Sequence, residues 1–356
     1  MLLASSITPS GAVWAESAAR KRMSTAHVVD LGEFSDHPLV AEFSESFCVT
    51  GASRVSGDVA GALASVRRTA LLLAAFDVAN SRVDPTVVVV DGSVPELVSD
   101  ACSFSALLQV SAAETPLAQR AKTMSGALAG GDVEWIVVAP PERAAMDSVT
   151  VQVAQGCALG LRVTGVVVAP MPRERDGWPN KIRRSARGLV QQLQDRLFDV
   201  PVQWSRAGKV PVLPSRAASG IEPRGAGPLS LTISPESASL SDLSSESDGG
   251  HVLSVTIPGL QYCDVEVGVW SQDPSYPSTH IVVRLDGVIA RIELDSTLRR
   301  CVAVEAVVAG DSIAVSFRAD PAQWPEPRAS SGASDRANEQ PDEQVDEQVG
   351  EREREA

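Results

Sequence analysis

Residues 134–169 read EWIVVAPPERAAMDSVTVQVAQGCALGLRVTGVVVA, and this stretch decides the fold. Its two ends, 134–139 and 162–169, are short apolar runs rich in valine. Runs of this kind are typical of parallel strands that are buried on both faces. Over 142–159, apolar residues recur at three- and four-residue spacing, which predicts a helix with one apolar stripe. The stretch therefore predicts a strand–helix–strand unit.

The same alternation extends to both sides of this unit. Further helices are predicted at 58–79, 116–128 and 181–198, and further strands at 86–90 and near 200–212. Strands that alternate with helices give an open, mainly parallel sheet with helices on both faces. The fold class predicted for this part of the chain is therefore α/β.

The hydrophobic period drops to two from His251 onward. Two hairpins are predicted there, because Asp286-Gly287 and Gly310-Asp311 each separate two strand-like runs and such dipeptides favour tight turns. About six strands fit before the chain becomes polar, and they predict a small all-β sandwich.

The chain is expected to divide into five parts. These are a poorly ordered N-terminal segment (1–45), the α/β domain (46–214), a flexible linker (215–250), the β-sandwich (251–327) and a disordered acidic tail (328–356). The tail has too few apolar residues to bury a core. We also expect the sandwich to move relative to the α/β domain, because the linker has little apolar surface with which to dock. Met1 and Met23 both remain candidate start residues.

The composition excludes several classes of protein. The net charge of −14 argues against a general nucleic-acid binder, because phosphate contacts need clustered Lys and Arg. No apolar run approaches the roughly 20 residues of a membrane span, so no transmembrane segment is expected. The five cysteines are widely scattered, which fits no metal site and indicates reduced thiols in a cytoplasmic protein.

The sequence lacks the residues of a phosphate-binding loop. Such a loop needs the pattern G-x-x-x-x-G-K-[ST], in which the lysine neutralises phosphate and the hydroxyl holds Mg²⁺. The chain has only four lysines: Lys21, Lys122, Lys181 and Lys209. Only Lys209 follows a glycine, and Val210 comes next in a predicted strand. We therefore predict no catalytic residue, no cofactor and no metal.

Four segments nevertheless resemble a known family. In the predicted sandwich, LDSTLRRC (294–301) and DPAQWP (320–325) are similar to the alpha-crystallin-like domain at the C-terminus of some bacterial ArsA-family proteins, the arsenite-pump and tail-anchored-protein-targeting ATPases. In the α/β part, WIVVAPPE (135–142) and GLRVTGVVVAP (160–170) resemble the family's strands and the helix entries beside them. The resemblance covers roughly residues 58–325 and implies a P-loop-NTPase-like sheet.

The chain departs from the family at three nucleotide contacts. The best remnant of the phosphate loop is 50–57, where Gly51 and Gly57 remain without Lys-Thr. Asp91 matches the family's Mg²⁺-coupling aspartate, but the Thr-Gly that should follow it is lost. Ala169 stands where the family has an asparagine that reads adenine. These degenerate remnants leave no confident cofactor-binding residue.

The resemblance therefore implies a non-catalytic pseudo-ATPase. Because the family acts as dimers, such a chain would pair with an intact ArsA-like ATPase or with itself, or it would hold a hydrophobic client. Two alternatives stay open. One is an active anion-transport or protein-targeting ATPase with unusual phosphate contacts, and the other is a holdase that resembles small heat-shock proteins.

Several residues have both a functional and a structural interpretation. Asp91 is either a Mg²⁺ ligand or a cap on the next helix. Arg299, Arg300 and Cys301 mark either a partner surface or the entry to a strand. Trp324 is either a peptide-binding anchor or the closure of a small β-core. The acidic tail either docks a basic partner or serves only to solubilise the chain.

Overall fold

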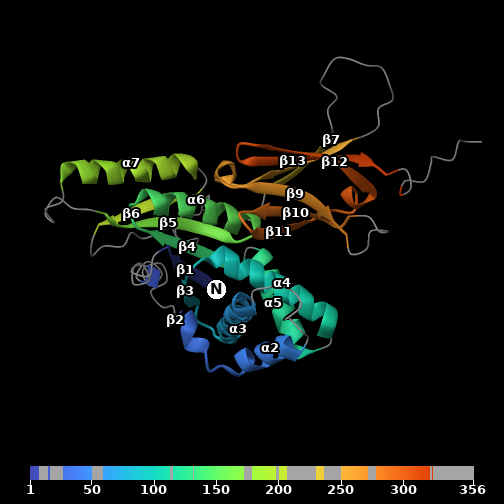
Figure 1. Ribbon diagram of the computed structural model, residues 1–356, viewed down its shortest axis with the longest axis horizontal. Helices are drawn as coiled ribbons and strands as arrows, with labels where there is room; N and C mark the ends of the chain where they lie inside the picture. Colours follow the sequence, from blue (N-terminus) through green and yellow to red (C-terminus); the bar gives the residue numbers. More distant parts are fainter. Residues whose placement is uncertain are drawn as a thin grey trace, which may run out of the picture.

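The computed structural model describes residues 1–7, 15–16, 27–49, 59–112, 115–130, 132–171, 179–197, 200–206, 230–235, 250–271, 278–320 and 323. The described chain forms a parallel sheet with its helices, followed by two antiparallel sheets (Figure 1). The predicted fold class, an α/β sheet flanked by helices and followed by a small β domain, is confirmed.

The parallel sheet has six strands in the order β2-β3-β1-β4-β5-β6, and every neighbouring pair is parallel. The strands are β1 (Leu2–Ser6), β2 (His27–Asp30), β3 (Thr86–Asp91), β4 (Glu134–Ala139), β5 (Arg162–Met171) and β6 (Val202–Arg206). All five residues of β1 are buried. The first strand of the chain therefore lies between β3 and β4 in the interior of the sheet.

The prediction that residues 1–45 are poorly ordered is wrong for 2–6 and 27–45. Residues 2–6 form β1. The second range contains β2, the 3-10 helix η2 (Leu31–Phe34) and most of α2 (Pro38–Val49). A strand of five residues with two serines carries no readable period in the sequence. Its burial comes from the neighbouring strands, which satisfy its backbone groups from both sides.

The remaining helices are α3 (Val59–Ser81), α4 (Val94–Ala112), α5 (Pro116–Ala129), α6 (Arg143–Ala158) and α7 (Asn180–Arg196). The predictions for α3, α5, α6 and α7 are confirmed to within two residues at each end. Sequence reasoning missed α4, although Val94, Leu97, Val98 and Ala101 are buried and recur at helical spacing. That signal was present in the sequence.

Alternate residues of each strand pack into different cores, because successive side chains point to opposite faces of a sheet. Leu3, Val88 and Val137 join the large cluster that also contains the buried residues of the helices. Leu2, Val87 and Val138 form a second cluster on the other face, together with Ala15 from the helical pair 15–16.

The C-terminal half contains a four-stranded sheet, in the order β12-β13-β8-β7, and a three-stranded sheet, in the order β11-β10-β9. Its strands are β7 (Ser230–Pro235), β8 (His251–Thr256), β9 (Val265–Trp270), β10 (His280–Leu285), β11 (Val288–Glu293), β12 (Cys301–Ala309) and β13 (Ser312–Ala319). Both predicted hairpins are confirmed, since β10 pairs with β11 and β12 pairs with β13. Asp286 and Gly287 have φ values of 45° and 91°, the left-handed backbone that this tight turn requires.

The sandwich begins earlier than predicted. Residues 230–235, which fall inside the predicted linker 215–250, form β7 and pair antiparallel with β8. The rest of that linker, apart from Gly250, lies outside the described residues, as does the acidic tail 328–356. The boundary at 251 therefore cuts off an edge strand of the four-stranded sheet.

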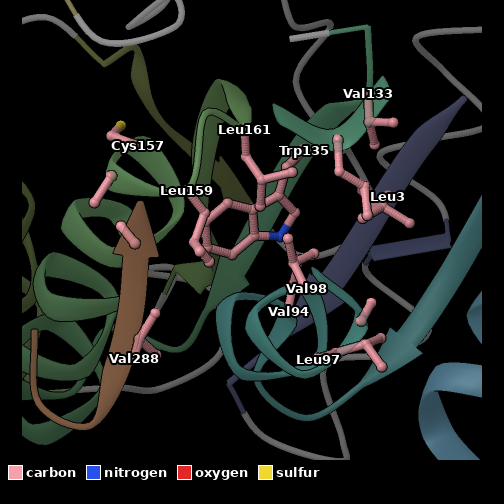
Figure 2. Packing of buried hydrophobic residues seen from close by; sticks show 14 of the residues in the cluster. Leu3, Val94, Leu97, Val98, Val133, Trp135, Cys157, Leu159, Leu161 and Val288 are labelled. Carbon is pink, nitrogen blue, oxygen red and sulfur yellow. The ribbon is translucent and has the colours of Figure 1, made fainter. Parts of the chain in front are cut away.

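The sandwich is also docked on the α/β part, which contradicts the predicted freedom of movement. β11 contacts α4, and α6 contacts β10, β11 and the 3-10 helix η5 (Leu260–Tyr262). One continuous hydrophobic cluster includes buried residues from both parts. Figure 2 shows part of it, with the Trp135 indole between Val94 and Val98 of α4 and Leu159 and Leu161 after α6. This docking could not be predicted from the sequence, because the interface residues look like ordinary core residues.

No helix in the described ranges is long and apolar enough to cross a membrane.

Candidate functional site at the carboxyl edge of the parallel sheet

The ends of β1 and β3 place Asp91 beside the centre of the sheet. Ser6, the last residue of β1, is the register partner of Asp91, the last residue of β3. Ser6 is buried, whereas Asp91 is exposed. Ligands of open α/β sheets bind outside the carboxyl ends of the strands, so Asp91 lies at the edge where a ligand would be expected.

The chain leaves the central strand β1 into residues 8–14, whose sequence is Thr-Pro-Ser-Gly-Ala-Val-Trp. A phosphate-binding loop connects a strand to the helix that follows it. By strand order, 8–14 is therefore the position at which such a loop would lie, and the sequence there contains one glycine and no lysine. These residues lie outside the described part of the structure.

The assignment of 50–57 as the remnant of the phosphate loop is corrected by this topology. Gly51 and Gly57 themselves lie outside the described residues. They are flanked by α2, which ends at Val49, and α3, which begins at Val59. A segment that connects two helices does not have the strand–loop–helix order of a phosphate-binding loop.

Asp91 does not cap the following helix, as one of its two interpretations proposed. Gly92 turns the chain with a φ of 104°, and Ser93 caps α4. The Ser93 Oγ accepts a hydrogen bond from the Glu96 backbone N–H at 3.4 Å, and the Ser93 carbonyl accepts one from the Leu97 N–H at 3.2 Å. Of the two predicted remnants that the structure describes, Asp91 and Ala169, Asp91 is exposed beside the end of β1.

Ala169 lies apart from Asp91. It belongs to β5, which is separated from β1 by β4. Its methyl group is buried in the second-face cluster with Val167 and Ile136. An apolar side chain in an apolar cluster offers no hydrogen bond to a base. Among the described residues, no group of three or more His, Cys, Asp or Glu side chains is arranged to hold a metal ion.

The same edge carries a cationic group that sequence reasoning missed. The four side chains of this cationic face of α7 are Lys181, Arg183, Arg184 and Arg187. Lys181, Arg184 and Arg187 are exposed, and Arg183 is half-buried and donates to the Asn180 side-chain oxygen. Because α7 follows β5, its N-terminal end lies at the carboxyl edge of the sheet. The sequence contained this information, because the first eight residues of the helix have four cations and no acid.

A groove of about 310 Å³ lies between α3 and α5. Its polar lining includes Asp77 and Arg120, whose charged groups are 3.6 Å apart. Its α3 residues lie in the second half of that helix, which leads to the start of β3 and so to the amino edge of the sheet. The groove is therefore distinct from the edge that carries Asp91.

Three cysteines are poor nucleophiles. Burial raises the pKa of the Cys102 thiol to about 11, although Arg291 partly offsets this. Burial and the nearby Asp286 raise the pKa of Cys263 to about 12. Burial also raises the pKa of Cys301. Since the thiolate is the reactive form, none of these thiols is set up for catalysis.

The segment 298–301 forms the entry to a strand. Leu298–Arg300 is a 3-10 helix, η6, and the buried Cys301 begins β12. Arg299 donates to the Leu294 carbonyl at 2.8 Å and pairs with Glu293 at 2.5 Å. This supports the structural interpretation of the segment. Trp324 lies outside the described residues.

Comparison of the chain with family models and with curated proteins finds no match. The relation to ArsA-family proteins therefore rests on the sequence resemblance alone and enters below as a proposal.

Proposed function

We propose that this protein is a non-catalytic ArsA-like pseudo-ATPase, which acts as a partner subunit of an intact ArsA-like ATPase or binds a client. One observation carries the proposal. Asp91 sits beside the end of β1, where a family member would hold Mg²⁺, yet the segment 8–14 that follows β1 has no lysine. The layout of a nucleotide site is thus combined with loss of the phosphate contact.

The missing lysine matters because phosphoryl transfer depends on positioning and on electrostatic stabilisation of the phosphate oxygens. Asp91 adds negative charge at this edge, which repels phosphate unless a cation intervenes. The arrangement therefore supports a chain that keeps the fold and its contact surfaces rather than the chemistry.

A holdase is the second candidate, and β12 favours it. This strand is the edge of the four-stranded sheet, and from Val304 to Ala309 its side chains are exposed. Val302 and Val304 are 53% and 61% exposed, and Glu305 is the only charged residue of the strand. Long apolar edges are usually protected by charges or proline. This one can accept an extended apolar segment as an added strand.

The first test is nucleotide turnover by the full-length protein. We expect no Mg²⁺-dependent ATP hydrolysis above about 0.1 s⁻¹, well below the usual enzyme range, and no change when Asp91 is replaced by Asn. Turnover that is lost in Asp91→Asn would refute the pseudo-ATPase and support the active alternative. Co-purification with an intact ArsA-like ATPase tests the partner role. A protein that stays monomeric in the presence of that ATPase would count against it.

The second test separates the holdase from the partner subunit. A Val304→Lys/Val307→Lys variant should lose any ability to suppress aggregation of a heat-denatured client protein. The control is Val110→Lys, on α4, because Val110 is 89% exposed and lies away from β12. If wild type, variant and control are equally inactive, the holdase is excluded.

A further inference from the structure

We propose that the acidic C-terminal segment of one copy of this protein binds the cationic face of α7 on another copy. The inference does not depend on the proposed function. It rests on the charge of the two segments and on where the fold places their ends.

The cationic face is unusual for a chain of net charge −14. Four cations occupy the first eight residues of α7, and the first turn contains no acid. The N-terminal end of a helix already carries partial positive charge, so cations there are unfavourable without an anion nearby. Among the described residues, Lys181, Arg184 and Arg187 form no ion pair.

The face is available because α7 packs through its other side. Ala186, Val190 and Leu193 are buried, and they recur at helical spacing toward the sheet. The exposed cations lie on the remaining surface of the same helix. A partner can therefore reach them without displacing any described element.

The chain itself contains the complementary segment. Residues 337–350 read ANEQPDEQVDEQVG, with five acids and no base. The wider tail 329–356 holds nine acids and three arginines, a net charge of 3 − 9 = −6. The remaining 328 residues then carry −14 − (−6) = −8, so the tail is far more acidic per residue than the rest of the chain on average. The five acids of 337–350 are opposite in sign to the four cations of α7 and exceed them by one.

The geometry favours a second copy over the same chain. At its C-terminal end, α7 touches the sandwich, where Arg196 stacks over the Tyr262 ring of η5 at 4.6 Å from the ring centroid. The cationic end lies about 24 Å further away, at about 1.5 Å per helical residue. The start of β13 adjoins the same part of the sandwich, because the Asp311 carbonyl accepts a hydrogen bond from the Ile257 N–H.

The end of β13 therefore lies about 24 Å beyond that point, for seven residue steps at about 3.4 Å each. Figure 1 shows α7 and the far end of the sandwich on opposite sides of the molecule. About 24 residues lead from the end of β13 to the middle of 337–350. A random coil of that length spans about 27 Å on average. The two offsets together approach about 50 Å, roughly twice that average, although full extension would reach about 80 Å. Binding within one chain would therefore stretch the segment beyond its average span, whereas binding to a second copy requires no stretching.

The test combines two variants that each lack one half of the contact. One is Lys181→Glu/Arg184→Glu/Arg187→Glu in the full-length chain, and the other is a chain that ends at residue 328. The charge-matched control is Arg67→Glu/Lys122→Glu/Arg318→Glu, whose three cations are exposed and lie on other elements. All four proteins are compared by sedimentation velocity at about 20 mM and 500 mM salt, with circular dichroism as the folding check.

We expect the wild type and the control to self-associate at low salt and to dissociate at high salt, since exposed charges are screened. Each variant alone should be monomeric. A mixture of the two should associate, because one supplies the tail and the other supplies the face. A labelled 337–350 peptide should bind the shortened chain at least tenfold more tightly than the same chain carrying the triple substitution.

Two results would overturn the proposal. One is a peptide that binds both shortened chains equally or neither of them at low salt. The other is a wild type that stays monomeric at every salt concentration while the peptide still binds the shortened chain, which would place the contact within one chain.

Discussion

Gln155 of α6 donates a hydrogen bond from Nε2 to the main-chain carbonyl of Leu285 in β10, at 3.0 Å. Both residues are buried, so the bond crosses a closed interface between the α/β part and the sandwich. Gly259 lies against Thr150 and Leu197 in the same interface. The two parts of the chain therefore form a joint core rather than two separately folded units.

Replacing Gln155 with Leu should lower the free energy of unfolding by about 1–3 kcal/mol, because the buried Leu285 carbonyl loses its partner. The measurement is urea unfolding followed by tryptophan fluorescence. Gln152→Leu serves as the control, because Gln152 is only half-buried and bonds to Ser148 within the same helix. Equal effects of the two substitutions would show that the interface bond contributes nothing specific.

Gly156→Ala should also destabilise the protein, by about 1–3 kcal/mol, as overpacked cores do. An added Cβ would lie 2.5 Å from Cζ3 of the buried Trp135 ring, which is also held by a 2.9 Å bond from Nε1 to the Ser5 hydroxyl. Gly126→Ala in α5 is the matched control, since nothing lies within 4 Å of its Cβ position. That change should stabilise the helix by about 0.5–1 kcal/mol. Thermal melts of the two variants measured side by side decide between these outcomes.

Cys102 should react slowly with iodoacetamide in the native protein. Its pKa of about 11 leaves only about 0.1% thiolate at pH 8. Peptide mass spectrometry should find it alkylated at least tenfold more slowly than in urea. Because Cys102 lies on α4 near Arg291 of β11, Gln155→Leu should increase its labelling if the sandwich then detaches more often. Labelling of native Cys102 at the unfolded rate would contradict the docked arrangement.

His280 should make the protein less stable in mild acid. Burial lowers its pKa in the folded state, and Arg291 and Arg299 act in the same direction while Glu293 opposes them. The unfolded chain, with an ordinary pKa of about 6.5, therefore binds a proton more readily. The stability that comes from neutral His280 is therefore fully present above about pH 6.5. It is lost as the pH falls from there toward the lower pKa of the folded protein.

The test compares the melting temperature of wild type and His280→Gln between pH 7.5 and 5.5. The melting temperature of the wild type should fall more on acidification than that of His280→Gln. The difference between the two falls is the contribution of His280, because the other titrating groups are the same in both proteins. His280 also packs edge-on against Trp270, with ring centroids 5.5 Å apart. A constant difference between the two proteins at every pH would assign the effect to this packing instead.

The sequence by itself determined the elements whose pattern is local. The valine-rich runs at 86–90, 134–139 and 162–169 predicted three parallel strands, because a strand buried on both faces must be apolar throughout. The Asp286-Gly287 hairpin was equally readable, because its left-handed backbone restricts which residues fit. The absence of a phosphate-loop lysine was also evident without any structure.

Only the tertiary structure decided where the chain places these parts. β1 is a strand because β3 and β4 satisfy its backbone from both sides, not because of its five residues. That position moved the expected phosphate loop from 50–57 to 8–14, and the register set Asp91 beside Ser6. The docking of the sandwich and the position of the α7 cations at the carboxyl edge depend on contacts between residues distant in the chain. No local pattern encodes such contacts, since burial is shared among elements that meet only after folding.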